Sequence, residues 1–212
     1  LLGDGKRLDA SIVLISVGRR PETRNLGLEN INLATDQRGY IEVDSHMQTQ
    51  VEGVYAIGDI VPTVQLAHVA SYEAFVAVDH ICGSPREAAY HAVPRCVYTS
   101  PEIAGVGMTE TEAAAKGIEV KVGRYDFQSL GKAKAAARTE GFVKVLTDAN
   151  DVIIGGAVVG SHGTELLEAI TLATHLGLTA HQVGQTIFPH PTMGEAILEA
   201  VHDIHKMSVH KP

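Results

Sequence analysis

A series of short β-branched stretches in the second half of the chain restricts the possible folds most strongly. Stretches of this kind, separated by few residues, favour an antiparallel sheet. The sequence Asp148-Ala149-Asn150-Asp151 is typical of a hairpin turn between the last two of them. From about residue 92 onward we therefore expect an α+β domain. The expected strands cover residues 97–98, 103–108, 118–127, 141–147 and 152–160.

Helices are expected to interrupt and follow this sheet. Three of them carry the signal of a capping box, in which a threonine is followed three residues later by Glu or Gln. A further helix is expected over residues 165–176, and the last helix shows an apolar stripe on one face. The three boxes pair Thr109 with Glu112, Thr179 with Gln182, and Thr192 with Glu195. The stripe consists of Met193, Ala196, Ile197, Ala200, Val201 and Ile204.

The first part of the chain has a different pattern. The apolar run 10–17, closed by the sequence Gly18-Arg19-Arg20-Pro21, predicts a buried strand of an open α/β sheet. Two more strands are expected at 40–43 and 53–57, and an alanine-rich helix at 66–82. We therefore expect an α/β piece up to about residue 90, before the α+β domain begins.

Charge and hydropathy exclude several classes of protein. The net charge is −8, the acids are scattered, and Lys and Arg form no dense block, so nucleic acid is not an expected partner. No apolar run approaches the ~20 residues of a membrane span, and we expect no membrane association. The start at Leu1 resembles no targeting peptide and lacks a methionine, which suggests a fragment or a processed chain.

The cysteines and histidines give no sign of a metal. Cys82 and Cys96 are too far apart for a redox pair or a zinc knuckle, and we expect them to be buried thiols in a reducing compartment. Among the 11 histidines, His202 and His205 have helical spacing but no third ligand nearby in sequence. The sequence therefore predicts no metal site.

Two segments of the first part could contact a ligand. Gly58 permits close backbone approach, and Asp59 can accept hydrogen bonds from the hydroxyls of a sugar or polyol. The alternative is an ordinary turn in which the aspartate caps the backbone. Gln65, Leu66, Ala67 and His68 open the expected helix, whose free N–H groups suit an electron-rich ring or a phosphate. His68 taken alone is expected to be a capping or packing residue.

His190 is the strongest candidate for acid–base chemistry. Histidine titrates near neutrality, and thiol–disulfide exchange needs a group that takes and returns a thiol proton. Pro189 and Pro191 stiffen the backbone around it. Glu195 could orient the imidazole if the chain turns back, but the local pattern alone favours a bond from Glu195 to the Thr192 backbone as part of a capping box.

Four ordered motifs resemble signatures of the flavoprotein disulfide reductases, also called pyridine nucleotide–disulfide oxidoreductases. Within this family, the second half of the motif set resembles the dihydrolipoamide dehydrogenases more than glutathione or mercuric reductases. The resemblance spans nearly the whole chain, although Phe188 stands where many dihydrolipoamide dehydrogenases have a histidine. The four motifs are S-V-G-R-R-P (16–21), Y-A-I-G-D (55–59), L-A-H (66–68) and H-P-T-M-G-E (190–195).

The resemblance implies a role for each candidate residue. Gly18 would lie near an NAD site, and Asp59 would hold the ribityl chain of FAD. Residues 65–68 would line the flavin end, together with Pro191, which a cis peptide bond would precede. His190 would be the acid–base catalyst and Glu195 its partner, so the resemblance reverses the preference for a simple cap. The histidine would act across a subunit boundary, in the active site of the other protomer.

The resemblance also implies the domain organisation and the activity. Residues 1–22 would end an NAD-binding domain, 23–90 would be the C-terminal part of an FAD-binding domain, and 91–212 would form a dimerisation domain. The fold class is thus an α/β remnant of Rossmann-like FAD/NAD-binding domains followed by an α+β dimerisation domain. The parent would be a homodimer that oxidises protein-bound dihydrolipoamide and reduces NAD.

Several expectations follow for partners and alternatives. The implied partners are lipoyl domains of 2-oxo acid dehydrogenase or glycine cleavage complexes, in the bacterial cytoplasm or, as the second choice, the mitochondrial matrix. The sequence contains no glycine-rich turn for FAD or NAD and no pair of flavin-facing cysteines, so the chain alone is expected to be inactive. A glutathione-type or mercuric-type reductase is the alternative enzyme. A non-catalytic dimerisation module is the alternative outside enzymes.

Overall fold

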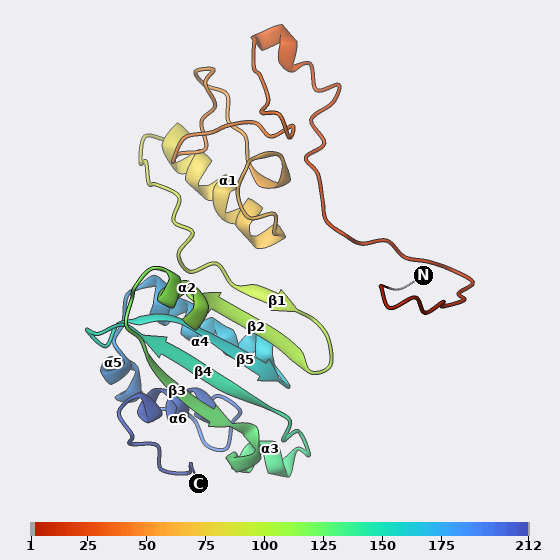
Figure 1. The fold of residues 1–212 in the computed structure, drawn as a ribbon. Coiled ribbons are helices and arrows are strands. Elements are labelled where there is room, and N and C mark those ends of the chain that lie inside the picture. The colour runs from red at the N-terminus through yellow and green to blue at the C-terminus, as the bar shows by residue number, and fades with distance from the viewer. Residues whose placement is uncertain (1–2, 212) are drawn as a thin grey trace. The chain divides into compact units, whose positions relative to one another are not determined.

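The chain divides into two compact units, Leu1–Ala88 and Ala89–Pro212. A computed structural model describes residues 3–211, so Leu1, Leu2 and Pro212 lie outside the described residues. Each unit has a hydrophobic core of its own. Figure 1 shows the chain from its N-terminal to its C-terminal elements.

The second unit is built on a five-stranded sheet with the strand order β1-β2-β5-β4-β3, in which every neighbouring pair is antiparallel. The antiparallel sheet expected from the sequence is confirmed. The predicted hairpin is also present, because the Asp148 amide donates to the Val152 carbonyl and Asp151 takes a left-handed conformation, with φ of 69°. The strands are β1 (Arg95–Val97), β2 (Glu102–Gly107), β3 (Lys121–Asp126), β4 (Gly141–Thr147) and β5 (Ile153–Gly160).

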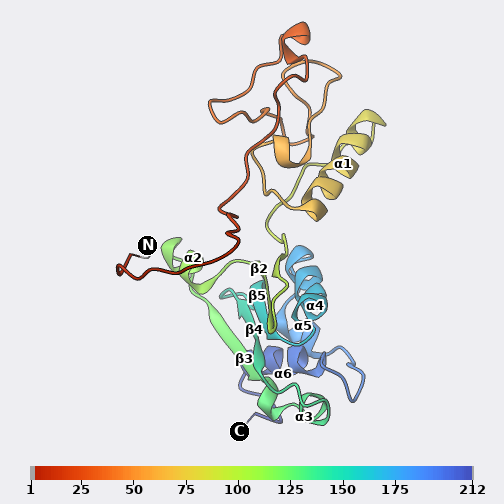
Figure 2. The same ribbon diagram turned by 90° about the vertical axis from the view of Figure 1, so that its right-hand side faces the viewer.

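Helices α4, α5 and α6 lie on one side of this sheet, as Figure 2 shows. Helix α4 packs on β2 and β5, and α6 packs on β3 and β4. The capping boxes predicted at Thr109 and Thr179 are both formed, at the starts of α2 and α5. The short helix α3 was not expected. The bounds are α2 (Glu110–Ala115), α3 (Gly131–Ala135), α4 (Gly163–His175), α5 (Ala180–Gly184) and α6 (Glu195–Ile204).

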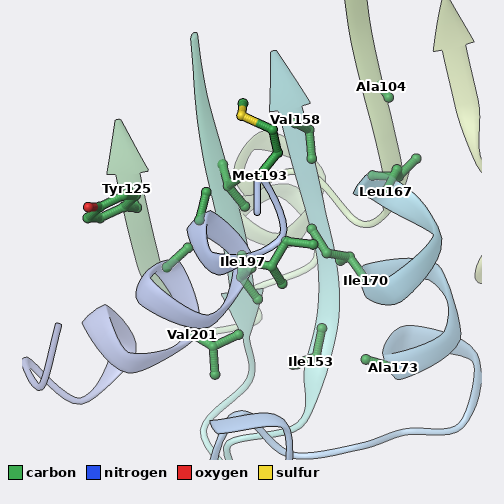
Figure 3. Close-up of a cluster of buried hydrophobic side chains, with 14 of the residues drawn as sticks. Ala104, Tyr125, Ile153, Val158, Leu167, Ile170, Ala173, Met193, Ile197 and Val201 are labelled. Carbon is green, nitrogen blue, oxygen red and sulfur yellow. The ribbon is translucent and has the colours of Figure 1, made fainter. Parts of the chain in front are cut away.

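The apolar stripe predicted on the last helix forms part of the core of this unit (Figure 3). All six residues of the stripe are buried, and Met193 lies just before α6 begins. A glycine allows the helix to approach the sheet, because a Cβ on Gly123 of β3 would lie 2.0 Å from the Ala200 carbonyl oxygen. This close packing fixes the position of α6 on the sheet.

The opposite face of the sheet carries apolar side chains that remain accessible. Val97 of β1 is 52% exposed and Ile103 of β2 is 48% exposed. On β4 the ring of Phe142 is covered by the guanidinium of Arg124, whose central carbon lies 3.8 Å from the ring centroid. Accessible apolar residues on one sheet face are typical of a surface that another chain covers.

The first unit contains one α-helix, α1 (Ala67–Ile81), and the 3-10 turns η1 (Leu28–Ile31) and η2 (Gly58–Ile60) among its described residues. Helix α1 confirms the helix predicted at 66–82. The strand predicted at 10–17 is wrong, because this segment forms no ladder and the residues from Ile12 to Ile15 are 75–87% exposed. A strand must share its N–H and C=O groups with neighbouring strands, and the described residues supply none.

The strands predicted at 40–43 and 53–57 are wrong for the same reason, although their apolar side chains are used. Ile41 and Ala56 pack with Leu33 and Val61 in a small core. The backbone near them forms only an isolated bridge between Gln48 and Tyr55. Burial of apolar side chains was therefore predictable here, whereas ladder formation depends on partner strands.

The prediction of buried cysteines is also wrong. Cys82 is exposed and Cys96 is half-buried, and both are free thiols. Cys82 lies directly after α1, where the helix ends and the chain meets solvent. Within residues 3–211, no helix has the length and hydropathy needed to cross a membrane, and no group of three or more potential ligands could hold a metal ion. His202 and His205 have separate partners, the Gly184 carbonyl and the Asp151 carboxylate.

Candidate active site

The structure brings His190 and Glu195 into direct contact. Nδ1 of His190 lies 2.7 Å from Oε1 of Glu195. The His190 side chain is 77% exposed, whereas that of Glu195 is 22% exposed. The pair therefore presents an accessible imidazole held by a largely covered carboxylate.

The loop before α6 creates this contact. The peptide bond between His190 and Pro191 is cis, as the resemblance implied. The chain then turns so that the Thr192 amide donates to Oε2 of Glu195 over 2.8 Å. Glu195 is the first residue of α6, which packs firmly on the sheet. A residue fixed at the start of a packed helix can hold a loop histidine in one orientation.

The third predicted capping box is only half formed. Glu195 accepts from the Thr192 amide, as such a box requires. The Thr192 hydroxyl, however, donates to the Pro189 carbonyl, and the N-cap of α6 is Gly194, without a side-chain cap. The expectation that Thr192 caps the helix is therefore wrong. The two interpretations of Glu195 turn out to be compatible, because each carboxylate oxygen has one partner.

Electrostatics fix the protonation pattern of the pair. Burial raises the pKa of the Glu195 carboxyl, but the hydrogen bonds from His190 and Thr192 lower it more, so its pKa lies below the ordinary value. An ionised carboxylate only accepts hydrogen bonds, so Nδ1 of His190 carries the shared hydrogen. This leaves Nε2 as the nitrogen that can take up or release a proton.

In the first unit, a second group of predicted residues lies together. The Gln65 amide donates to the Asp59 carbonyl over 3.1 Å. Arg19 donates to the Gln65 carbonyl, and its Nε lies 4.0 Å from the Asp59 carboxylate. The Asp59 side chain is 49% exposed. Arg19, which the sequence placed in a motif but gave no role, thus joins the segment before α1 to the turn at Asp59.

The sequence reasoning missed Glu73 of α1. This residue is fully buried. One of its carboxylate oxygens accepts from the Gly58 amide over 2.7 Å, and the other accepts from the Thr63 hydroxyl over 2.6 Å. Glu73 therefore fixes the turn that presents Asp59. The signal was a lone acid between Val69 and Val76, on the face of α1 that is otherwise buried and apolar.

The remaining predicted site residues of the first unit are Gly18 and the three residues at the start of α1, Leu66, Ala67 and His68. Leu66 is the N-cap residue of α1 without a side-chain cap bond, Ala67 is the first helical residue, and His68 is exposed. Gly18 has a φ of 131° and no heavy atom within 4 Å of its would-be Cβ. Gly18 is therefore in a conformation that favours glycine, but it packs against no part of the site.

These residues fit one portion of a flavin dinucleotide. Asp59 offers a half-exposed carboxylate to hydroxyl donors, and a φ of 73° at Gly58, with Ala70 only 3.2 Å from its would-be Cβ, brings the backbone close to α1. The described residues contain no glycine-rich turn after a strand that could hold the pyrophosphate.

The sequence matches two family descriptions. "Pyridine nucleotide-disulphide oxidoreductase, dimerisation domain" matches residues 93–201, and "Pyridine nucleotide-disulphide oxidoreductase" matches residues 1–74. The chain is 42% identical to a dihydrolipoyl dehydrogenase of Thermus scotoductus, over 98% of this chain and 45% of that protein. It is 44% identical to a dihydrolipoyl dehydrogenase of Trypanosoma brucei brucei, over 93% of this chain and 42% of that protein.

Solved structures give the same relationship. LpdA from Mycobacterium tuberculosis superposes with a TM-score of 0.89 at 30% identity, covering 94% of this chain and 44% of that chain. The flavoprotein disulfide reductase RclA from Escherichia coli has a TM-score of 0.80 at 24% identity, over 88% of this chain and 43% of that chain. At this identity the similarity to RclA shows only that the two chains share a fold. The chain thus spans about half the length of the relatives it matches.

Proposed function

Because the chain belongs to the pyridine nucleotide-disulphide oxidoreductase family, we propose that it works as the C-terminal half of a flavoprotein that oxidises dihydrolipoyl groups and reduces NAD. The identity to dihydrolipoyl dehydrogenases supports this choice of substrate. The observation that carries the proposal is the contact between His190 and Glu195, which supplies an oriented, accessible base. A complete enzyme would join these residues to a first half like that of the relatives.

The proposed chemistry needs a proton acceptor for thiols. Oxidation of a dihydrolipoyl group breaks two S–H bonds, forms one S–S bond and releases two electrons and two protons. NAD takes up both electrons and one proton as a hydride, and the other proton goes to solvent. His190 would accept a thiol proton at Nε2, because the thiolate is the species that attacks a disulfide. Glu195 would hold the ring and stabilise its charged form.

The residues of the first unit would serve the cofactors. Asp59, with the segment 65–68, would contact FAD, Gly18 would lie near NAD, and Pro191 would lie near the flavin. When bound, FAD would supply a two-electron carrier between the thiols and NAD. In the same proposal, residues 1–22 end an NAD-binding domain, 23–90 belong to an FAD-binding domain, and 91–212 form the dimerisation domain.

We further propose a homodimer in which His190 faces the thiol site of the other protomer. The dimerisation-domain match at 93–201 supports the dimer. The accessible apolar face with Val97 and Ile103 offers a surface that a second copy could cover. The high exposure of the His190 side chain, 77%, agrees with a role outside its own protomer. Lipoyl domains would be the protein partners, since they carry the substrate group.

An assay separates this function from that of another disulfide reductase. The complete enzyme should reduce NAD with dihydrolipoamide as donor, and it should oxidise NADPH with glutathione disulfide or Hg²⁺ at least tenfold more slowly. Faster NADPH oxidation with either acceptor would overturn the choice of substrate. The family assignment would survive that result.

The second candidate is that the 212-residue chain by itself is a non-catalytic dimerisation module. The exposed apolar segment from Ile12 to Ile15 favours it, because this segment has no packing partner among the described residues. The purified chain should then show no absorbance at about 450 nm, where oxidised flavin absorbs. A yellow protein with stoichiometric FAD would contradict the module and support flavin binding by these residues alone.

A further inference from the structure

Three carboxylates line one face of α6, each four residues after the last. The Glu195, Glu199 and Asp203 side chains are 22%, 9% and 7% exposed. Residues four apart on a helix lie one above the other, so the three charges form a row. Each meets a basic group from a segment outside the helix, at 2.7, 2.8 and 2.7 Å. The three partners are His190, His210 and Lys211.

The last residues of the chain are thus bound to α6 beside the His190–Glu195 pair. Oε2 of Glu199 accepts from the Ser208 hydroxyl and, over 2.9 Å, from the Val209 amide. Oε1 of the same side chain contacts Nδ1 of His210 at 2.8 Å. These bonds outweigh the effect of burial, which raises the pKa of Glu199, and leave that pKa below its ordinary value.

The pairs His190–Glu195 and His210–Glu199 influence the same neighbouring groups. Tyr125 of β3 is buried, and burial, then Glu199 and Glu195, raise its pKa to about 12. The charge of His210 also acts on Glu195, where it adds to the bonds from His190 and Thr192 that lower the pKa against burial. A change of charge at Glu199 or His210 should therefore alter the electrostatic environment of Glu195 and, through Glu195, the protonation of His190.

We propose that His210 and Glu199 are positioning residues that set how readily the His190–Glu195 pair takes up a proton. The catalytic meaning of this coupling rests on the proposed function, but the coupling itself is a property of the chain. The His210 side chain is 70% exposed, while the Glu199 side chain that it contacts is 9% exposed. His210 and Glu199 thus influence protonation of His190 from one helical turn away along α6.

The other charged groups around α6 have separate roles. Lys211 pairs with Asp203, which also accepts from the Arg124 amide of β3. The Arg124 side chain pairs with Asp126. On α5, His181 contacts Gln185. Three more groups lie near the end of α6. The charge of Lys206 acts on Asp203. The ring of His202 is bonded to the Gly184 carbonyl, and His205 is paired with Asp151.

The test is a histidine NMR titration of the 212-residue chain, with the His190 resonance assigned by its loss in His190→Gln. His210→Asn keeps a hydrogen-bond donor for Glu199 but removes a cation, so the midpoint of the His190 titration should rise by about half a pH unit. Glu199→Gln removes an anion, so the midpoint should fall by a similar amount. The control His205→Gln changes a comparable pair at Asp151 and should leave the midpoint in place.

Opposite signs identify electrostatic coupling, because mere loosening of the tail would move both variants in the same direction. Equal signs, or midpoints within about 0.1 pH unit of the parent in both variants, would overturn the proposal. If the His210 variant fails to fold, Glu199→Gln and Lys211→Met provide the comparison, with a fall and a small rise expected. Since the titration needs no turnover, its failure is distinguishable from a failure of the proposed function.

Discussion

Glu195 holds His190 with one carboxylate oxygen and the Thr192 amide with the other, at 2.7 and 2.8 Å. The same side chain therefore orients the imidazole and fixes the loop that carries it. Because the carboxylate belongs to the first residue of α6, the position of the ring depends on the packing of that helix.

Replacing His190 by glutamine removes the base but keeps a polar side chain of similar length. Turnover of dihydrolipoamide by the complete enzyme should fall by ~10² or more, the effect of losing a general acid–base. Steady-state kinetics measure this loss. His181→Gln is the matched control, because His181 is also exposed and contacts only Gln185 through its ring. Turnover within a few-fold of the parent would show that His190 is not the base.

Replacing Glu195 by alanine should change both stability and pH dependence. The folded pKa of Glu195 is lowered, so its stabilisation is present above the unfolded value of 4.5 and is lost as pH falls through the folded pKa. Urea unfolding should show a loss of about 1 kcal/mol at neutral pH, which disappears at strongly acidic pH.

The same variant tests the catalytic role of Glu195. Without the carboxylate the charged imidazole loses its stabilising partner, so the acidic limb of the rate profile should move to lower pH. A residue that only supports the loop would lower stability and leave that profile unchanged. Thr192→Ala is a useful comparison, because the Thr192 hydroxyl that it removes donates to the Pro189 carbonyl.

Glu73→Gln should loosen the turn at Asp59. The amide nitrogen of glutamine cannot accept the bond that a carboxylate oxygen accepts from Gly58 or Thr63. Loss of one such buried bond should cost about 2 kcal/mol of stability in the first unit and reduce FAD retained by the complete enzyme after dialysis. The exposed Glu87, changed to Gln, is the control. Equal flavin content in both variants would contradict the role given to Glu73.

Gly123→Ala should separate α6 from β3. The added methyl would lie 2.0 Å from the Ala200 carbonyl oxygen and 3.0 Å from Ile204, so helix or strand must shift. We expect a loss of about 2–3 kcal/mol in the free energy of unfolding. Gly131→Ala is the matched control, since nothing lies within 4 Å of its would-be Cβ and it begins α3. Similar stability of the two variants would exclude close packing at Gly123.

The local sequence pattern was enough to predict an element whose backbone hydrogen bonds form within the element itself. Helix α1 and the apolar face of α6 follow from side-chain spacing, because a helix satisfies its backbone within one segment. The β4–β5 hairpin also follows, since its turn residues join strands that are adjacent in sequence. The motif residues around position 190 identified the histidine, because a base between two prolines is visible in the sequence alone.

Tertiary structure decided everything that needs a distant partner. The run 10–17 has the composition of a buried strand but is exposed, because strand pairing depends on neighbours that composition does not supply. The local pattern could not decide between a cap and a catalytic partner for Glu195, because Thr192 is three residues away and His190 five, and both are within reach. Only the path of the chain, with Thr192 turned toward Pro189, gave each oxygen of the carboxylate its partner.

The buried acids Glu73 and Glu199 show the same division. The sequence places an acid among the apolar residues of both α1 and α6, and the structure shows that both acids are buried. The sequence did not determine which groups would meet them, because those groups come from a turn before α1 and from the last residues of the chain. The presence of an acid on an apolar helix face can be read from the sequence. The partners that a buried carboxylate needs come into contact with it only when the chain has folded.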